Sequence, residues 1–297
     1  MTAFDGQSIT YDANGNPTKY YNGGTMTWRN GRELASLTKN GVTASYLYDE
    51  SGLRTKKTVG GVVTNYHVIN GVLYGEYTGS HRLLYMFDEA GTRYSFLYNG
   101  STYYYVFNGQ GDVIGITDGT GNMLARYTYD AWGKPLTITD GAGNDVSGNA
   151  SHIANVNPFR YRGYYYDKES GLYYLQSRYY DPVVGRFINA DDSDVLFEDQ
   201  DNLVEHNLFT YCLNNPVNMI DEDGRFAITL SVIAVGALIT AASAAAIWAV
   251  NTPSFQRAWG SACSWFMGLR GAGRGLFKTA KAKKPAKKKT AKKSGKE

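Results

Sequence analysis

The stretch of sequence that decides the fold runs from Asn157 to Asp192 and reads NPFRYRGYYYDKESGLYYLQSRYYDPVVGRFINADD. It contains two tyrosine-rich runs, and each ends in an Asp that is followed four residues later by a Gly. Aromatic side chains favour β-strands, and Asp and Gly are typical of the turns between them. Residues 171–181 follow a period of two, which predicts that one face of an extended segment carries Leu172, Tyr174, Gln176, Arg178 and Tyr180. The opposite face then carries Tyr173, Leu175, Ser177 and Tyr179.

A second block follows at residues 207–225 and reads NLFTYCLNNPVNMIDEDGR. Its Asn-Asn-Pro and Asp-Glu-Asp-Gly segments have the residue types that favour turns. The composition changes abruptly at Phe226, where an uncharged run begins. We therefore place a domain boundary after Arg225 and treat residues 157–225 as one unit.

Residues 1–156 contain a degenerate repeat with similar turn chemistry. An aromatic residue is followed by Asp or Asn and, four positions after the aromatic, by Gly. The copies begin at Tyr11, Tyr48, Phe87, Phe107 and Tyr129, so successive copies are 37, 39, 20 and 22 residues apart. Weaker copies around Gly31 and Gly71 fill the two long steps. We predict one β-hairpin per repeat, with neighbours stacked to share a core; an ordinary antiparallel sandwich is the alternative.

Composition agrees with a chain rich in strands and divides it in two. The 25 Tyr and 34 Gly, against 7 Pro, suit short strands joined by tight turns. Residues 1–225 hold 17 basic and 26 acidic side chains, whereas Glu297 is the only acid after Arg225. Such asymmetry predicts different partners for the two parts. The 2 Cys and 4 His show no ligand spacing, so we expect no disulfide, no metal site and no cofactor.

Residues 157–225 resemble the C-terminal core of the RHS/YD-repeat family. There a Gly-Leu-Tyr-Tyr segment leads to Arg-Tyr-Tyr-Asp-Pro, and Arg-Phe-x-x-x-Asp, Asn-x-x-x-Tyr, Asn-Pro-x-Asn and Asp-x-x-Gly follow; all occur here in order. Residues 1–156 match more loosely. The resemblance implies an all-β fold, in which antiparallel β-hairpin repeats form a curved, spiralling sheet. We expect this sheet to be part of a shell that complete members close around a payload, and a hydrophobic helix and a disordered basic tail to follow it.

The same resemblance implies a self-cleaving site, in which an aspartate pair and an arginine cut the chain just past the Asp-x-x-Gly. Matched residue by residue, the arginine is Arg178 and the aspartates are Asp191 and Asp221, with the cut between Arg225 and Phe226. Two carboxylates held close together cannot both ionise, so one keeps a proton as an acid while the other activates water. A nearby arginine can hold one of them ionised and stabilise the oxyanion.

The chain departs from the family pattern at three positions of this site. Asp192 and Glu222 stand where the family has proline, and Arg225 replaces a common leucine. The alternative interpretation is that these aspartates only cap turns, as Asp commonly does.

The residues after Arg225 divide into three segments. Residues 226–250 carry no charge in 25 positions, and about 20 such residues span a bilayer core, so we predict a transmembrane or inserting helix. A buried helix stored inside the shell is the alternative. Residues 251–277 mix aromatic and arginine side chains, as a linker or an amphipathic helix does. Residues 278–297 hold 10 lysines and are expected to be a disordered tail that binds anionic lipid or nucleic acid, or only aids solubility.

These segments determine the function that we expect. Residues 226–296 contain no Asp, Glu or His, so the payload itself is not expected to be an enzyme. We predict the C-terminal part of an RHS-type polymorphic toxin that encloses, and releases by self-cleavage, a short membrane-active effector. Its partners would be the rest of the shell, an immunity protein and a membrane. The alternatives are a cell-surface interaction protein anchored by residues 226–250, or a nucleic-acid-binding tail on a degenerate tip.

The location follows from the same reasoning. The segment that opens with Met1-Thr-Ala-Phe-Asp5 lacks a basic and an apolar region, so we expect no signal peptide in this chain. We therefore expect a secreted or cell-surface location as part of a longer parent, with a membrane-associated C-terminus.

Overall fold

A large antiparallel sheet dominates the computed structural model, which describes residues 1–89, 91–191, 207–221, 223–225 and 227–229. Fourteen consecutive strands pair in chain order. They are β3 (Thr10–Tyr11), β4 (Pro17–Lys19), β5 (Thr25–Arg29), β6 (Glu33–Lys39), β7 (Val42–Tyr48), β8 (Arg54–Val59), β9 (Val62–Ile69), β10 (Val72–Thr78), β11 (His81–Phe87), β12 (Arg93–Tyr98), β13 (Ser101–Phe107), β14 (Val113–Thr117), β15 (Met123–Tyr129) and β16 (Pro135–Asp140). A separate hairpin precedes them and pairs β1 (Ala3–Phe4) with β2 (Gln7–Ser8).

The predicted Asp-Gly turns connect these strands along one edge of the sheet, because alternate turns of a meander lie on the same edge. In the turn after β7, Asp49 Oδ1 accepts hydrogen bonds from the backbone N–H groups of Ser51 and Leu53, at 2.9 and 3.0 Å. Gly52 takes a φ of +78°, which glycine adopts without a steric penalty. We call this edge the aspartate edge; its repeated turns begin at Asp12, Asp49, Asp88, Asn108 and Asp130.

The opposite edge mostly carries shorter turns. Asn40-Gly41 and Asn99-Gly100 each connect two strands with only two residues, and all four residues have positive φ. Such turns match the twist of the paired strands. The predicted hairpin repeat is therefore confirmed. Most of the longer turns lie on the aspartate edge, and most of the shorter turns lie on the opposite edge.

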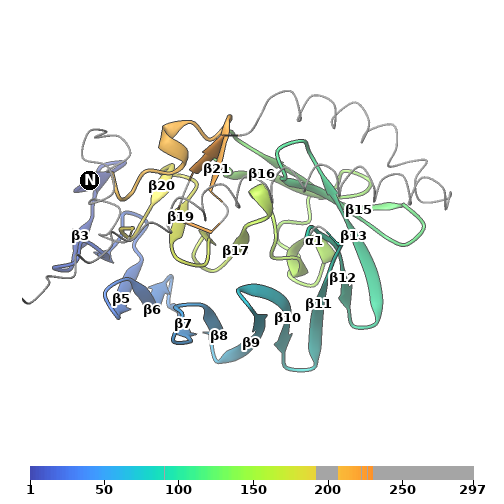
Figure 1. The fold of residues 1–297 in the computed structure, drawn as a ribbon, viewed down its shortest axis with the longest axis horizontal. Helices are drawn as coiled ribbons and strands as arrows, with labels where there is room; N and C mark the ends of the chain where they lie inside the picture. The colour runs from blue at the N-terminus through green and yellow to red at the C-terminus, as the bar shows by residue number, and fades with distance from the viewer. Residues whose placement is uncertain (90, 192–206, 222, 226, 230–297) are drawn as a thin grey trace, which may run out of the picture.

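The large sheet curls around the elements that follow it, as Figure 1 shows, and it does not close on itself. The first of these elements is the short helix α1 (Ile153–Val156). A four-stranded sheet comes next, with the 3₁₀ turn η1 (Tyr161–Gly163) before it; its strands are β17 (Tyr165–Asp167), β18 (Leu172–Tyr174), β19 (Tyr179–Asp181) and β20 (Arg186–Phe187). The 3₁₀ turn η2 (Cys212–Asn214) leads to β21 (Met219–Asp221), which pairs with β22 (Ala227–Thr229).

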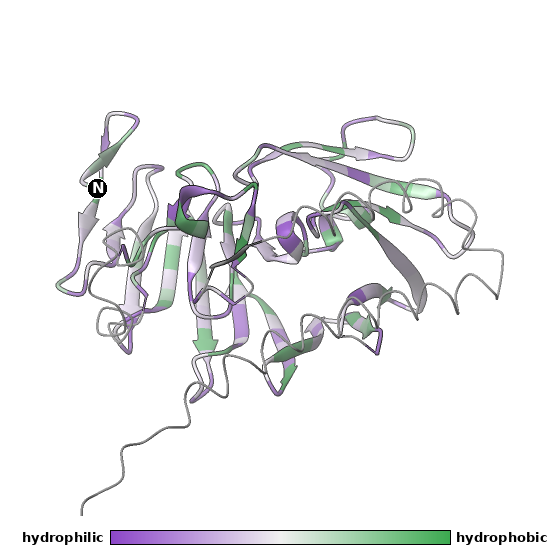
Figure 2. Cartoon of the chain, turned by 45° about the horizontal axis from the view of Figure 1, so that its top comes forward, coloured by the Kyte–Doolittle hydropathy of each residue, from purple (hydrophilic) through white to green (hydrophobic). Residues whose placement is uncertain are grey.

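Aromatic side chains join the curled sheet to the core block, as we call the described part of residues 157–225. Ring centroids lie 6.0 Å apart for Tyr46 and Tyr179, and 5.7 Å apart for Tyr66 and Tyr165. The other face of the sheet is exposed and mixes polar pairs with single apolar side chains: the Thr38 and Thr43 hydroxyls pair across strands at 2.9 Å, and Leu47 is 46% exposed. Figure 2 shows the resulting alternation of apolar and polar residues along the strands. The sheet and the core block thus share one apolar interior, which positions both.

The all-β prediction is confirmed, and two local predictions need correction. Residues 171–181 are not one extended segment: they form the β18–β19 hairpin, in which Tyr173 pairs with Tyr180. The helix expected over residues 226–250 is a strand at residues 227–229, because the chain turns back after Asp221 and pairs with β21. Residues 230–297 lie outside the described part; they include the rest of the expected helix and the expected basic tail. Among the described residues, no helix has the length and apolar character needed to span a bilayer.

Candidate active site

A tight turn between β18 and β19 places Arg178. The N–H of Leu175 donates to the carbonyl of Arg178 at 2.9 Å, and Gln176 takes a left-handed φ of +62°. This reversal uses neither Gly nor Asp, so turn chemistry could not reveal it. As a result Ser177 and Arg178, which a period of two puts on opposite faces, both contact the same segment of the chain.

The guanidinium of Arg178 joins the two predicted aspartates. Its Nη1 lies 3.0 Å from Asp191 Oδ2, and its Nη2 lies 3.1 Å from Asp221 Oδ2. Nη1 also donates to the carbonyl of Leu208 at 3.0 Å, and the guanidinium packs 3.6 Å from the centre of the Phe187 ring. Arg178 is 3% exposed, so water screens these ion pairs little. We call Arg178, Asp191 and Asp221 the Arg178 cluster.

Asp221 also holds the turn that contains the predicted cut. Its Oδ1 accepts the N–H groups of Gly224 and Arg225, at 2.9 and 3.0 Å. Gly224 has a φ of +77°, as the glycines of the aspartate edge do. The register of β21 and β22 pairs Asp221 with Ala227, so Arg225 lies in the turn that joins the two strands. Phe226 itself lies outside the described residues.

Burial and charge balance set the electrostatics of this cluster. Burial raises the pKa of Asp221 to about 6; Arg178 opposes the shift, and Asp223 adds to it. Burial likewise lowers the pKa of Arg178, although Asp191 and Asp221 counteract it. One guanidinium thus faces two carboxyl groups in a dry setting, which favours a proton on one of them at mildly acid pH.

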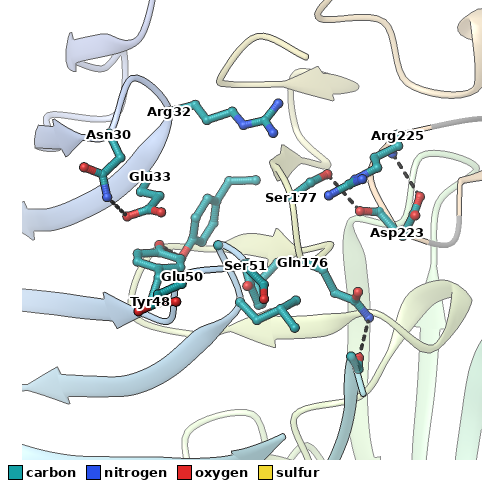
Figure 3. Close-up of a pocket in the computed structure, with 15 residues that line it drawn as sticks. Asn30, Arg32, Glu33, Tyr48, Glu50, Ser51, Gln176, Ser177, Asp223 and Arg225 are labelled. Atoms are coloured by element: carbon teal, nitrogen blue, oxygen red, sulfur yellow. Dashed lines mark hydrogen bonds between the residues drawn. The ribbon is translucent and has the colours of Figure 1, made fainter. Parts of the chain in front are cut away.

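A cleft of about 430 Å³ opens beside the Asp221–Arg225 turn on the aspartate edge. Asp223, Arg225 and Ser177 form one wall, and turns of the large sheet form the other with Glu33 and Glu50 (Figure 3). Arg225 is exposed, whereas Gly224 is buried. Solvent therefore reaches the turn from the side of the cleft.

The structure brings together all three residues that we matched to the self-cleaving site, and their catalytic role stays a prediction. Asp192 and Glu222 lie outside the described residues. Sequence reasoning missed Ser177, whose hydroxyl lies 2.9 Å from the carbonyl oxygen of Asp223 and 2.8 Å from that of Gly224. Within the described ranges, no group of three or more His, Cys, Asp or Glu side chains is arranged to hold a metal ion.

A second buried ion cluster, which sequence reasoning also missed, joins β8 to β17. Arg54 Nη1 lies 2.5 Å from Asp167 Oδ2, and Lys57 Nζ lies 2.8 Å from Asp167 Oδ1. The Arg54 guanidinium packs 4.3 Å from the Tyr174 ring centre and 4.9 Å from that of Tyr66. Burial works against an ionised Asp167, but the two cations hold its pKa below the usual value. We call Arg54, Lys57 and Asp167 the Arg54 cluster.

Known proteins share this sequence and fold. The RHS Repeat model matches residues 107–145. The chain is 39% identical over 237 residues to the tRNA3(Ser)-specific nuclease WapA of Bacillus spizizenii, and 36% identical over 236 residues to the tRNA nuclease WapA of Bacillus subtilis. Each match covers 76% of this chain and 9% of the relative, so the chain spans about a tenth of their length.

Solved structures share the fold at lower identity. The Tc holotoxin pore of Photorhabdus luminescens, in a form that carries a mutation in TccC3, matches with a TM-score of 0.55 and 19% identity. The match covers 76% of this chain and 11% of that one. At this identity the likeness shows the fold alone.

A curved meander of Asp-Gly hairpins, wrapped around a tyrosine-rich core block, defines a repeat-built β-shell segment. The match to the RHS Repeat family and the similarity to the WapA proteins narrow this class to one family. The chain belongs to the RHS/YD-repeat family.

Proposed function

We propose that this chain is the C-terminal part of an RHS-type toxin and cuts itself between Arg225 and Phe226. One observation carries the proposal: the buried guanidinium of Arg178 joins Asp191 and Asp221, and Asp221 holds the N–H groups of Gly224 and Arg225. Two carboxyl groups and one guanidinium thus lie next to the peptide segment that precedes the expected cut.

The reaction is a hydrolysis that needs only water. Water adds to the carbonyl carbon of Arg225 while Asp191 accepts its proton as the general base. Asp221 keeps a proton more readily than an ordinary aspartate, because burial raises its pKa to about 6, and it donates that proton to the leaving nitrogen. The peptide C–N bond breaks, and the products are a new carboxyl end at Arg225 and a new amino end at Phe226. The cleft beside Arg225 supplies the water.

A toxin role for the parent protein is supported by the relatives. Two of them are tRNA nucleases, and the structural neighbour is part of a toxin assembly. The effector of this chain is proposed to differ from a nuclease, since residues 226–296 offer no Asp, Glu or His for catalysis. Residues 226–250 would insert into a membrane and residues 278–297 would bind anionic lipid.

The organisation and partners follow the same proposal. Residues 1–156 form the repeat region and residues 157–225 the core. Residues 226–250, 251–277 and 278–297 form the inserting segment, the aromatic linker and the basic tail. In the described part, β3 and β16 end the sheet and leave edges on which the rest of a shell could pair. An immunity protein would neutralise the released effector, and the parent would act outside the cell or at its surface.

Intact-mass measurement of the purified chain tests the self-cleavage. We expect two fragments, residues 1–225 and 226–297, to accumulate during incubation at pH 5–6. A mass that stays whole through prolonged incubation at every pH between 4 and 8 would rule the cleavage out. In that case the chain would fit the alternative of a surface protein anchored through residues 226–250, because an anchor must stay attached.

Dye release from vesicles tests the effector. The peptide of residues 226–297 should bind anionic vesicles and release their contents, whereas Val235→Asp should bind and release nothing. A charge at the centre of a membrane helix costs roughly 2.5–3.5 kcal/mol on insertion scales. High salt should weaken the binding, because the Debye length falls from about 10 Å at 0.1 M to about 3 Å at 1 M. Tight DNA binding without release from any vesicle would favour the nucleic-acid alternative instead.

A further inference from the structure

Ser177 contacts the candidate cleavage turn through both its backbone and its side chain. Its N–H donates to the carbonyl of Asp223 at 3.3 Å. Its hydroxyl lies 2.9 Å from that carbonyl oxygen and 2.8 Å from the carbonyl oxygen of Gly224. A hydroxyl has one proton and can donate to only one carbonyl at a time. Each of the two carbonyls already accepts one other donor, the Ser177 N–H at Asp223 and Arg178 Nε at Gly224, and the shorter hydroxyl distance favours donation to Gly224.

The carbonyl of Gly224 is therefore held by two donors. Arg178 Nε donates to the same oxygen, and the two other donor nitrogens of Arg178 hold the two aspartates. On the far side of this peptide, Asp221 Oδ1 accepts the N–H of Arg225. The peptide between Gly224 and Arg225 is thus fixed at its oxygen and at its nitrogen. This fixes the orientation of the peptide that enters Arg225, immediately before the expected cut.

The turn of Ser177 packs directly against Gly224. A Cβ built on Gly224 would lie 2.8 Å from the Leu175 carbonyl oxygen and 2.8 Å from the Ser177 hydroxyl. The two turns are therefore in direct contact there. Removal of the hydroxyl should leave the Gly224 carbonyl with Arg178 as its remaining side-chain donor.

We propose that Ser177 is a positioning residue for self-cleavage, whose hydroxyl holds the Gly224 carbonyl and so presents the bond after Arg225 to the Arg178 cluster. The role rests on the self-cleavage proposed above. It assigns no bond-making to Ser177, because the hydroxyl donates to a carbonyl oxygen and is not aimed at a carbonyl carbon.

The kinetic test compares Ser177→Ala with a matched control elsewhere in the core block. Ser170→Ala is the control, since the buried Ser170 hydroxyl donates to the carbonyl of Asp167 at 3.0 Å in a turn outside the Arg178 cluster. Loss of one neutral hydrogen bond should slow cleavage by about three- to tenfold in Ser177→Ala. Ser170→Ala should cleave at the wild-type rate with a comparable loss of thermal stability, and Ser177→Thr, which keeps the hydroxyl, should cleave at nearly the wild-type rate.

Native-state hydrogen exchange at the Gly224 and Arg225 amides separates this proposal from the cleavage itself. Ser177→Ala in the uncleaved Asp221→Asn background should speed exchange at these amides, and Ser170→Ala should not. If the wild type never cleaves, self-cleavage fails, while the exchange result still decides whether Ser177 positions the turn. Unchanged exchange, or equal cleavage rates in the two serine variants, would overturn the proposal. A covalent acyl adduct on Ser177 would also overturn it, because Ser177 would then be a nucleophile.

Discussion

The Arg54 cluster and the Arg178 cluster are both buried and both pair arginine with aspartate, yet the number of cations that contact each aspartate differs. In the Arg54 cluster two cations contact Asp167, at 2.5 and 2.8 Å, and Lys57 also pairs with Glu169 at 3.0 Å. In the Arg178 cluster a single guanidinium serves two carboxyl groups, at 3.0 and 3.1 Å. The pKa of Asp167 is lowered, whereas burial raises that of Asp221 to about 6.

This difference separates a structural ion cluster from one suited to proton transfer. Two cations in direct contact keep Asp167 charged, so it can connect β8 to β17 but has no proton to give. Asp221 shares one guanidinium with Asp191 and can hold a proton near pH 6, as an acid catalyst must. The number of cations that contact each aspartate, and not the type of residue, decides which role it can take.

The largest expected effect comes from the Arg178 cluster. Asp221→Asn and Asp191→Asn should each slow self-cleavage by about 10²–10⁴-fold, the usual contribution of a general acid or base. Asn at position 221 can still accept the N–H groups of Gly224 and Arg225, so the turn should persist. Mass spectrometry against time gives the rates. Cleavage of both variants at the wild-type rate would remove any catalytic difference between the two clusters.

The matching change in the Arg54 cluster should act on stability instead. Asp167→Asn leaves the buried Arg54 without the carboxylate with which it pairs, which costs about 3–5 kcal/mol of unfolding free energy, whereas Lys57 keeps its pair with Glu169. Denaturant unfolding measures the loss. Asp140→Asn is the control, since this half-buried aspartate caps a turn through an oxygen that Asn also has, and its effect should be small. A stable Asp167→Asn protein that no longer cleaves would contradict the division of roles.

Stability should depend on pH in opposite directions at the two sites. The folded state raises the pKa of Asp221 from 3.8 to about 6, so its contribution to stability is present below pH 4 and is lost as pH rises through 6. The total change is about 3 kcal/mol for two pKa units. The pKa of Asp167 is lowered, so its contribution is present above pH 4 and is lost at lower pH.

Unfolding curves of the wild type and Asp221→Asn between pH 4 and 7 check the sign. Relative to the variant, the wild type should lose stability as pH rises. The cleavage rate should fall over the same range, because Asp221 loses the proton it donates. A stability difference that stays constant with pH would show that Asp221 does not titrate in this window.

The smallest expected effect comes from a substitution at Gly224, which tests how closely the Ser177 turn packs against the Asp221–Arg225 turn. Gly224→Ala and Gly143→Ala both place a side chain at positive φ, +77° and +94°. Only the first meets neighbours, because nothing lies within 4 Å of a Cβ at Gly143. Gly224→Ala should therefore cost about 1–3 kcal/mol more than Gly143→Ala in thermal unfolding. Equal losses would indicate that the Ser177 turn can move aside.

Much of the fold was predictable from the sequence because its chemistry is local. Each Asp-Gly turn of the aspartate edge forms its hydrogen bonds within five residues, and strand alternation has a period of two. The family motifs also singled out Arg178, Asp191 and Asp221, which the structure places together. The short helix α1, whose Ala154 carbonyl accepts the Tyr127 hydroxyl at 2.8 Å, gave no recognisable signal in a Gly- and Asn-rich stretch.

The sequence by itself determined the repeat, the turn types and the all-β class, whereas only the tertiary structure decided which charges share a site. Arg54 lies 113 residues from Asp167, and no local pattern encodes that distance. The β18–β19 turn likewise forms without Gly or Asp, because the pairing of Tyr173 with Tyr180 imposes it. That turn brings both Ser177 and Arg178 into contact with Gly224. Burial within the core block then sets the pKa of Asp221, since the cost of a buried charge depends on everything packed around it.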